Sequence, residues 1–211
     1  MISLKTFALF TFGVALAALP VQAAPGDVDG DGIPDPAEAL LGTDPMTADT
    51  DGDGMNDKDD QKPLEVADPI PDAGKSGGLV IRSAKVEDNM DPKTRRDVAD
   101  HLEIELRNPG ASEIKGLQVF FTIKDDKGPT IESYYRSLPG FTVNAGSSRA
   151  LHFDLKGATD WAAATDHFRS NEHSMLYKTP NSKTVAIKVA VDGYAPSRVT
   201  IKKDEGMEVP D

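Results

Sequence analysis

The sequence contains no cysteine, four histidines and a single tryptophan. Without cysteine the chain has no disulfide framework and no thiolate ligand for zinc. The histidines form neither an H-x-x-x-H nor an H-E-x-x-H pattern, and no serine sits in a G-x-S-x-G motif. We therefore expect no zinc enzyme and no serine hydrolase of these types. Catalytic pairs of carboxylates form only in space, so that alternative stays open.

Long apolar runs are absent after the first 23 residues. The one such run, residues 7–19, has 13 residues, which is too short to span a bilayer. Lys5 precedes it, Pro20 ends it, and small residues at 21–23 offer a cleavage site. We expect residues 1–23 to be a signal peptide removed after Ala23, with a retained anchor as the alternative. The mature chain would have no transmembrane segment and would be extracellular, at the cell surface or periplasmic.

Basic residues are scarce in only one part of the chain. Residues 24–72 hold thirteen Asp and two Glu against two Lys, a net charge of −13. Residues 73–211 hold equal numbers of acidic and basic residues. The acidity therefore belongs to one segment. Nothing in this distribution attracts a phosphate backbone, so we expect no nucleic-acid partner.

Two twelve-residue blocks repeat within the acidic segment, residues 27–38 (DVDGDGIPDPAE) and residues 49–60 (DTDGDGMNDKDD). Carboxylates occupy positions 1, 3, 5, 9 and 12 of both blocks. They are Asp27, Asp29, Asp31, Asp35 and Glu38 in the first block, and Asp49, Asp51, Asp53, Asp57 and Asp60 in the second. Position 6 is glycine in each block, and position 7 is Ile33 or Met55.

This spacing is suited to calcium. Ca²⁺ takes six to eight oxygen ligands, which one chain supplies by wrapping around the ion with carboxylates on alternate residues. Glycine permits the bend. We predict that all ten carboxylates and the backbone carbonyls of Ile33 and Met55 are calcium ligands. The alternative is a solvated acidic linker, but random acidity does not reproduce one spacing twice.

The flanking residues distinguish two calcium scaffolds. An EF-hand needs a longer helix on each side of its loop, whereas only residues 36–41 after the first block favour a helix. Pro36 suits its start, with Asp35 as a cap, and Gly42 suits its end. With the GTDP sequence at 42–45, residues 27–57 instead resemble the bacterial thrombospondin type 3 repeat. That resemblance implies loop carboxylates that hold calcium in place of an apolar core, over residues 24–62, with Asp44 as a weaker ligand candidate.

Residues 63–78 are rich in Pro, Asp and Gly and predict a linker. From Leu79 the pattern changes to alternating apolar and polar residues, as in LEIEL at 102–106 and LQVFFTI at 117–123. Seven or eight such short strands, separated by turn sequences such as the one at 138–140, predict an antiparallel β-sandwich over residues 79–203, with a tail at 204–211. Residues 160–169 predict a short helix or turn, with Trp161 and Phe168 plugging one end of the sandwich.

The LEIELRNPG, GLQVFFTIKD and VAVDGY segments resemble immunoglobulin-like or fibronectin type III modules of bacterial surface proteins. We therefore expect a mainly β, exported, non-enzymatic calcium-binding protein. A calcium-rigidified stalk would present the sandwich to a protein or glycan partner at the cell surface, as in adhesion. The alternatives are a carbohydrate-binding accessory module of a glycan-degrading system and a small secreted hydrolase.

Overall fold

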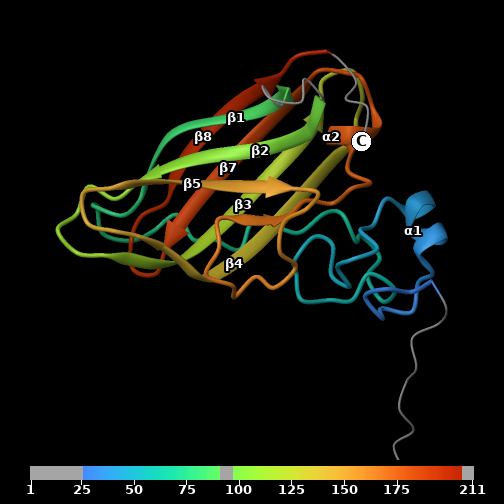
Figure 1. Cartoon of the computed structure of the whole chain (residues 1–211), viewed down its shortest axis with the longest axis horizontal. Helices are drawn as coiled ribbons and strands as arrows, with labels where there is room; N and C mark the ends of the chain where they lie inside the picture. The colour runs from blue at the N-terminus through green and yellow to red at the C-terminus, as the bar shows by residue number, and fades with distance from the viewer. Residues whose placement is uncertain (1–25, 91–96, 206–211) are drawn as a thin grey trace, which may run out of the picture.

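The computed structural model describes residues 26–90 and 97–205, and Figure 1 shows their arrangement. The predicted signal peptide and most of the predicted tail lie outside these residues. The strands are β1 (Val80–Met90), β2 (Asp97–Arg107), β3 (Ile114–Asp125), β4 (Ile131–Val143), β5 (Ser148–Asp154), β6 (His167–Arg169), β7 (Lys183–Val191) and β8 (Ser197–Lys203). The helices are α1 (Asp35–Leu41) and α2 (Met175–Lys178). The prediction of a mainly β protein is confirmed.

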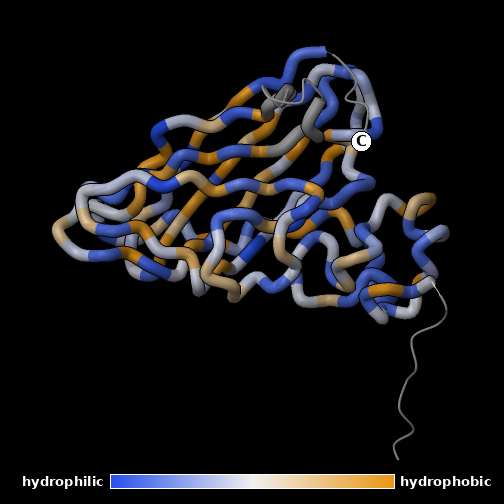
Figure 2. Tube along the Cα trace, in the orientation of Figure 1, coloured by the Kyte–Doolittle hydropathy of each residue, from blue (hydrophilic) through white to orange (hydrophobic). Residues whose placement is uncertain are grey.

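The strands form two four-stranded sheets that enclose one apolar core. One sheet has the order β1-β2-β5-β6 and the other β4-β3-β7-β8. The alternating residues predicted to face inward are buried, including Ile104 of β2, Val119 of β3 and Ile187 of β7. Across the core, the rings of Phe121 and Phe153 lie 5.3 Å apart. Figure 2 shows the apolar residues concentrated in the strands, with few along the acidic segment.

One strand pair departs from the predicted antiparallel pattern. β6 pairs in parallel with β5, because residues 155–166 return the chain to the same end of the sheet. Residues 160–169 contain turns and this short strand, so the helix alternative is wrong. Phe168 is fully buried, and its backbone passes so close to Gly157 that a Cβ there would lie 2.1 Å from it. The Trp161 ring stacks on the Phe168 ring with centroids 6.0 Å apart.

The predicted turn at 138–140 is also wrong, because β4 runs through Pro139 and Gly140. The register of β3 against β4 shifts between Lys115 and Leu117, at a bulge where Gly116 has φ +77°. Because β4 is an edge strand, Pro139 can lie there without breaking a ladder on both sides.

The predicted short helix of the acidic segment forms as α1. It ends at Gly42, whose φ of 90° is left-handed and whose N–H donates to the carbonyl of Glu38. The predicted cap is wrong: Pro34 is the N-cap and Asp35 the first helical residue. The Asp35 carboxylate instead accepts a hydrogen bond from the N–H of Val28. None of the helices in residues 26–90 and 97–205 has the length and apolar character to cross a membrane.

Residues 63–78, which we name the strap, lie against the outer face of the β4-β3-β7-β8 sheet. Val66 and Ile70 of the strap are buried, and the strap makes single bridges with Ser133 and Tyr194. Lys188 of β7 binds Asp68 at 2.7 Å and Asp72 at 2.6 Å. The composition of the strap predicted a linker, and in the structure this segment packs on the sheet, where Asp68 and Asp72 pair with the buried Lys188 ammonium.

Candidate metal centre

The first acidic block forms a tight loop around three carboxylates. Asp27, Asp29 and Asp31 each offer an oxygen within 4.8 Å of the other two. One oxygen of each accepts a backbone N–H two or three residues further on, at 2.5–3.1 Å. Gly30 and Gly32 have φ of 77° and 93°, which side-chain-bearing residues rarely adopt. The sequence therefore folds locally into a wrap that brings the three carboxylates together.

The second block repeats this geometry. Asp49, Asp51 and Asp53 also offer oxygens within 4.8 Å of each other. Each accepts a backbone N–H two or three residues ahead at 2.7–3.0 Å, and Gly52 and Gly54 have φ of 87° and 94°. The repeat seen in the sequence is thus a repeat in structure.

A third group joins the two blocks. Asp31 and Glu38 of the first block and Asp57 of the second offer oxygens within 4.8 Å of each other, and all three residues are buried. Asp57 is fixed by Thr50, whose N–H and hydroxyl donate to its two oxygens at 2.8 Å and 2.6 Å. The spacing alone assigned Glu38 and Asp57 to separate loops.

The other predicted ligands belong to none of these groups of described residues. Asp35 accepts from the N–H of Val28, and Asp60 accepts from the N–H of Lys62 at 2.8 Å. Ile33 is buried, whereas Met55 is 46% exposed. The weaker candidate Asp44 is buried and forms an ion pair with Arg169, so its carboxylate already has a cationic partner. Positions 1, 3 and 5 of each block therefore converge, while Asp35 and Asp60 do not join them.

Four oxygens of these groups are buried without a hydrogen-bond partner in the described part of the chain. They are Oδ2 of Asp29, Asp31 and Asp51, and Oε2 of Glu38. A buried charge without a partner is costly, so their pKa values rise. Burial, helped by the charges of Asp29 and Asp31, raises the pKa of Glu38 to about 8. Burial likewise raises the pKa of Asp51 to about 7, and that of Asp57 to about 6 against the hydrogen bonds from Thr50.

These residues fit a hard cation. The donor atoms are carboxylate oxygens, most of their side chains are ordered by backbone hydrogen bonds, and four of the oxygens are buried without a donor among the described residues. Ca²⁺ or a similar ion would supply the missing positive charge. Histidine and cysteine, which zinc prefers, are absent from all three groups.

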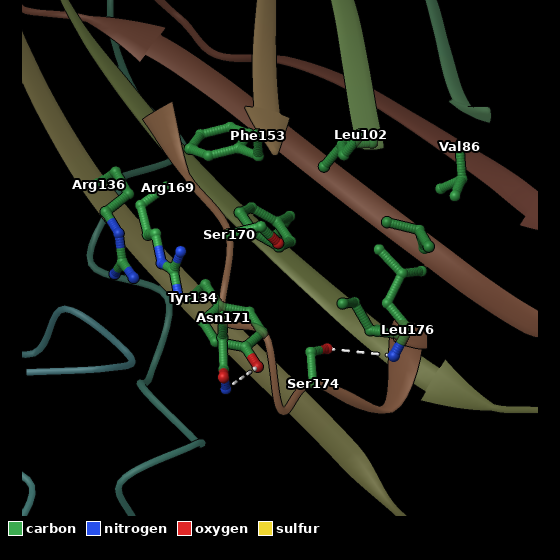
Figure 3. Close-up of a pocket in the computed structure, with 13 residues that line it drawn as sticks. Val86, Leu102, Tyr134, Arg136, Phe153, Arg169, Ser170, Asn171, Ser174 and Leu176 are labelled. Atoms are coloured by element: carbon green, nitrogen blue, oxygen red, sulfur yellow. Dashed lines mark hydrogen bonds between the residues drawn. The ribbon is translucent and has the colours of Figure 1, made fainter. Parts of the chain in front are cut away.

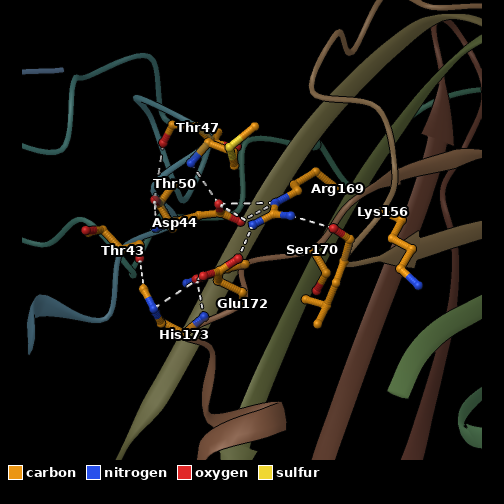
Figure 4. Close-up of polar contacts among 12 residues, drawn as sticks. Thr43, Asp44, Thr47, Thr50, Lys156, Arg169, Ser170, Glu172 and His173 are labelled. Carbon is orange, nitrogen blue, oxygen red and sulfur yellow. Dashed lines mark hydrogen bonds and ion pairs between the residues drawn. The ribbon is translucent and has the colours of Figure 1, made fainter. Parts of the chain in front are cut away.

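The acidic segment is docked on the sheets by polar contacts, which Figure 4 shows in part. Arg169 of β6 binds Asp44 through two nitrogens, each 3.0 Å from a carboxylate oxygen. Arg136 of β4 donates to the carbonyl of Thr50 at 2.7 Å. His173 lies 2.6 Å from the carbonyl of Thr43. Sequence reasoning missed these residues, because no local pattern shows that a polar side chain of one segment meets another segment more than 80 residues away.

Two hollows adjoin this docking contact. The cavity between the sheets, which Figure 3 shows with Arg136 and Arg169 at its edge, has a volume of about 10 Å³, room for one water molecule at most. A cleft of about 610 Å³ lies between the acidic segment and the sheets, lined by residues that include Asp49, Tyr135 and Trp161. The Trp161 ring already contacts the Arg136 guanidinium at 4.4 Å and Phe168.

No family model and no curated protein matches this sequence. Among solved structures, a β-glucuronidase of Bacteroides uniformis is similar over 61% of this chain and 13% of its own, with 15% identity and a TM-score of 0.30. A β-glucuronidase from glycoside hydrolase family 2 covers 61% and 11%, with 11% identity and a TM-score of 0.32. A putative late embryogenesis abundant protein covers 60% and 71%, with 16% identity and a TM-score of 0.32. This chain thus spans about an eighth of the first of these structures. TM-scores this low support neither a family nor an activity.

Proposed function

We propose that residues 27–60 bind Ca²⁺ and that the bound ions hold this segment in its docked form on the two sheets. The observation that carries the proposal is the set of four buried carboxylate oxygens without a partner. Burial of like charges at this density is unfavourable unless protons or cations neutralise them. Cations explain the arrangement better than protons, because protonated carboxyls would have no need of the repeated wrapping geometry.

Calcium suits the site better than magnesium or zinc. Two chain loops with several carboxylates each form flexible oxygen cages, whereas Mg²⁺ keeps most of its water and rarely takes an all-protein cage. The expected export signal would place the protein where calcium is abundant. Extracellular calcium modules of Kd roughly 10⁻⁴–10⁻³ M are then occupied.

The function that follows is that of an exported, non-enzymatic interaction module. We assign the two sheets to the immunoglobulin-like class, a common scaffold of surface proteins, and the acidic segment to the thrombospondin type 3 repeats. The contacts of Asp44 with Arg169 and of Thr50 with Arg136 join this segment to the sheets. The binding surface for a protein partner at the cell surface would therefore include both parts.

A carbohydrate-binding accessory module is the second candidate, favoured by the cleft that Tyr135 and Trp161 line. Stacking on a sugar needs an accessible aromatic face, and the contacts of Trp161 with Arg136 and Phe168 occupy much of its ring. These contacts of Trp161 favour a protein partner over a glycan. A glycan array with the mature chain in calcium separates the two, because only the second candidate predicts calcium-dependent retention of defined glycans.

Titration calorimetry on the mature chain tests calcium binding. Asp51→Asn removes one buried anionic ligand, and we expect at least tenfold weaker binding at its site, about 1.4 kcal/mol. Asp59→Asn is the matched control, because Asp59 is exposed and belongs to none of the three groups. Asp68 is a poor control, since it pairs with Lys188. Equal losses for Asp51→Asn and Asp59→Asn would show a diffuse polyanion instead of built sites.

A further inference from the structure

The group that spans the two repeats does not follow from the spacing within either one. Within a loop, position 12 and position 9 would each serve the ion of their own block. In the structure, Glu38 at position 12 of the first block and Asp57 at position 9 of the second meet each other and Asp31. Asp57 does not belong to the group formed by positions 1, 3 and 5 of its own block.

Two unpartnered oxygens point independently to a ligand between these residues. Glu38 is 0% exposed and its Oε2 has no hydrogen-bond partner among the described residues. Asp31 is 6% exposed, and its Oδ2 is unpartnered in the same way. Thr43 reaches only the other oxygen of Glu38, at 3.3 Å. The unpartnered oxygens therefore belong to side chains that are nine-tenths buried and part of one group.

We infer that Asp31, Glu38 and Asp57 form a composite Ca²⁺ site that both repeats share, which rests on the proposed function that this segment binds calcium. Asp31 and Glu38 of the first block and Asp57 of the second would supply the oxygen ligands. Asp31 also belongs to the group of Asp27 and Asp29, so its carboxylate would bridge this ion and the ion of the first loop.

The nearest cationic side chain does not replace the ion. Lys58 lies beside Gly32, where an added Cβ would be 2.7 Å from its ammonium, and its charge acts on Asp31. Lys58 is exposed, and one ammonium at the surface leaves the buried charge of Glu38 and Asp57 largely unbalanced.

The composite site is continuous with the docking contact. The Thr50 hydroxyl that donates to Asp57 also accepts from the N–H of Asp44, at 2.9 Å, and Asp44 binds Arg169 of β6. Thr50 in turn offers its carbonyl to Arg136. An ion at this site thus fixes the two repeats to each other and positions the residues that the sheets hold.

Non-additivity tests the composite site on the mature full-length chain. We expect Glu38→Gln and Asp57→Asn each to remove one Ca²⁺ per chain, measured by equilibrium dialysis, and the double variant to remove the same single ion. Glu38→Gln with Asp53→Asn is the matched comparison. Asp53 lies in the second loop only, so its effect should add to that of Glu38→Gln.

The outcomes separate this inference from the proposed function. If Glu38→Gln and Asp57→Asn lose two ions when combined, each residue serves its own loop and the composite site is wrong, although calcium binding stands. If the unmodified chain binds no calcium, the proposed function fails as well. Should Asp57→Asn not fold, Glu38→Asp keeps the charge but shortens the reach. It should weaken one calcium step at least tenfold, and unchanged binding would overturn the inference.

Discussion

The acidic segment and the two sheets are stabilised by opposite means. Among residues 26–60, Ile33 is the one large apolar side chain that is buried, and the other buried residues are carboxylates and threonines. The sheets bury a continuous cluster of apolar side chains from both layers. Apolar burial is favourable without any ligand, whereas buried carboxylates are favourable only with a counter-charge. We therefore expect the two sheets to fold alone and the acidic segment to depend on bound cations.

The contact between the acidic segment and the sheets is made by polar groups. Arg169 and Arg136 bind groups of the acidic segment whose positions depend on its folded form. Both arginines are buried in the folded protein. Loss of the segment would return both charges to water, which costs the sheets little, since solvent then hydrates the guanidinium groups.

Calcium removal should produce the largest difference between the acidic segment and the sheets. With a chelator, at a pH above the raised pKa values of Glu38 and Asp51, residues 26–60 should lose their compact form, because neither ions nor protons neutralise the carboxylates and too little apolar surface offsets the backbone entropy. Limited proteolysis should then cut this segment first and leave a fragment with both sheets. In millimolar calcium the segment should resist. The same cleavage pattern in both solutions would contradict the role of the ion.

The next largest effect should come from the ion pair that joins the two parts. Arg169→Ala leaves Asp44, which is 1% exposed, as a buried charge without its partner. We expect a loss of about 3–5 kcal/mol in unfolding free energy of the calcium-loaded protein. Lys127→Ala removes an exposed ion pair with Glu205 and should cost about 1 kcal/mol or less. Chemical denaturation of both variants measures the difference, and similar small losses would show that the docking contact is weak.

A smaller effect should appear in the pH dependence of the calcium-free protein. Glu38 has a pKa of about 8 in the folded chain against 4.5 for the free group, and Asp51 about 7 against 3.8. Between these limits the folded state binds more protons than the unfolded state, so the unfolding free energy should fall as pH rises from about 4 to 8. Saturating calcium should flatten this slope, because the ion replaces the protons. Thermal melts at several pH values, with and without calcium, measure this slope.

The smallest effect is expected for the sheets alone. The apolar core cluster consists of residues from Leu79 onward, and no candidate metal group among the described residues includes a sheet residue. A chain of residues 77–211 should therefore melt cooperatively at a temperature that calcium does not change. Calorimetry with calcium and with chelator tests this. A strong rise with calcium would place a further site in the sheets.

Much of each loop was predictable because its contacts are local. The carboxylates accept hydrogen bonds from N–H groups two or three residues ahead, and glycines allow the bends. The spacing alone therefore predicted that the carboxylates at positions 1, 3 and 5 of each block would converge. The inward residues of β2 and β3 were predictable because alternation and burial share a period of two. Burial of Val119 and Ile104 follows directly from this rule.

The tertiary structure alone decided how distant parts meet. Asp44 and Arg169 are 125 residues apart, and Thr43 and His173 are 130 residues apart. Glu38 meets Asp57 of the other repeat, and β6 pairs in parallel with β5. Local sequence encodes turns and faces, because those depend on neighbouring dihedral angles. Contacts between distant residues depend on which surfaces pack together and so bring a buried charge next to a partner. Those surfaces exist only once the sheets and loops have formed.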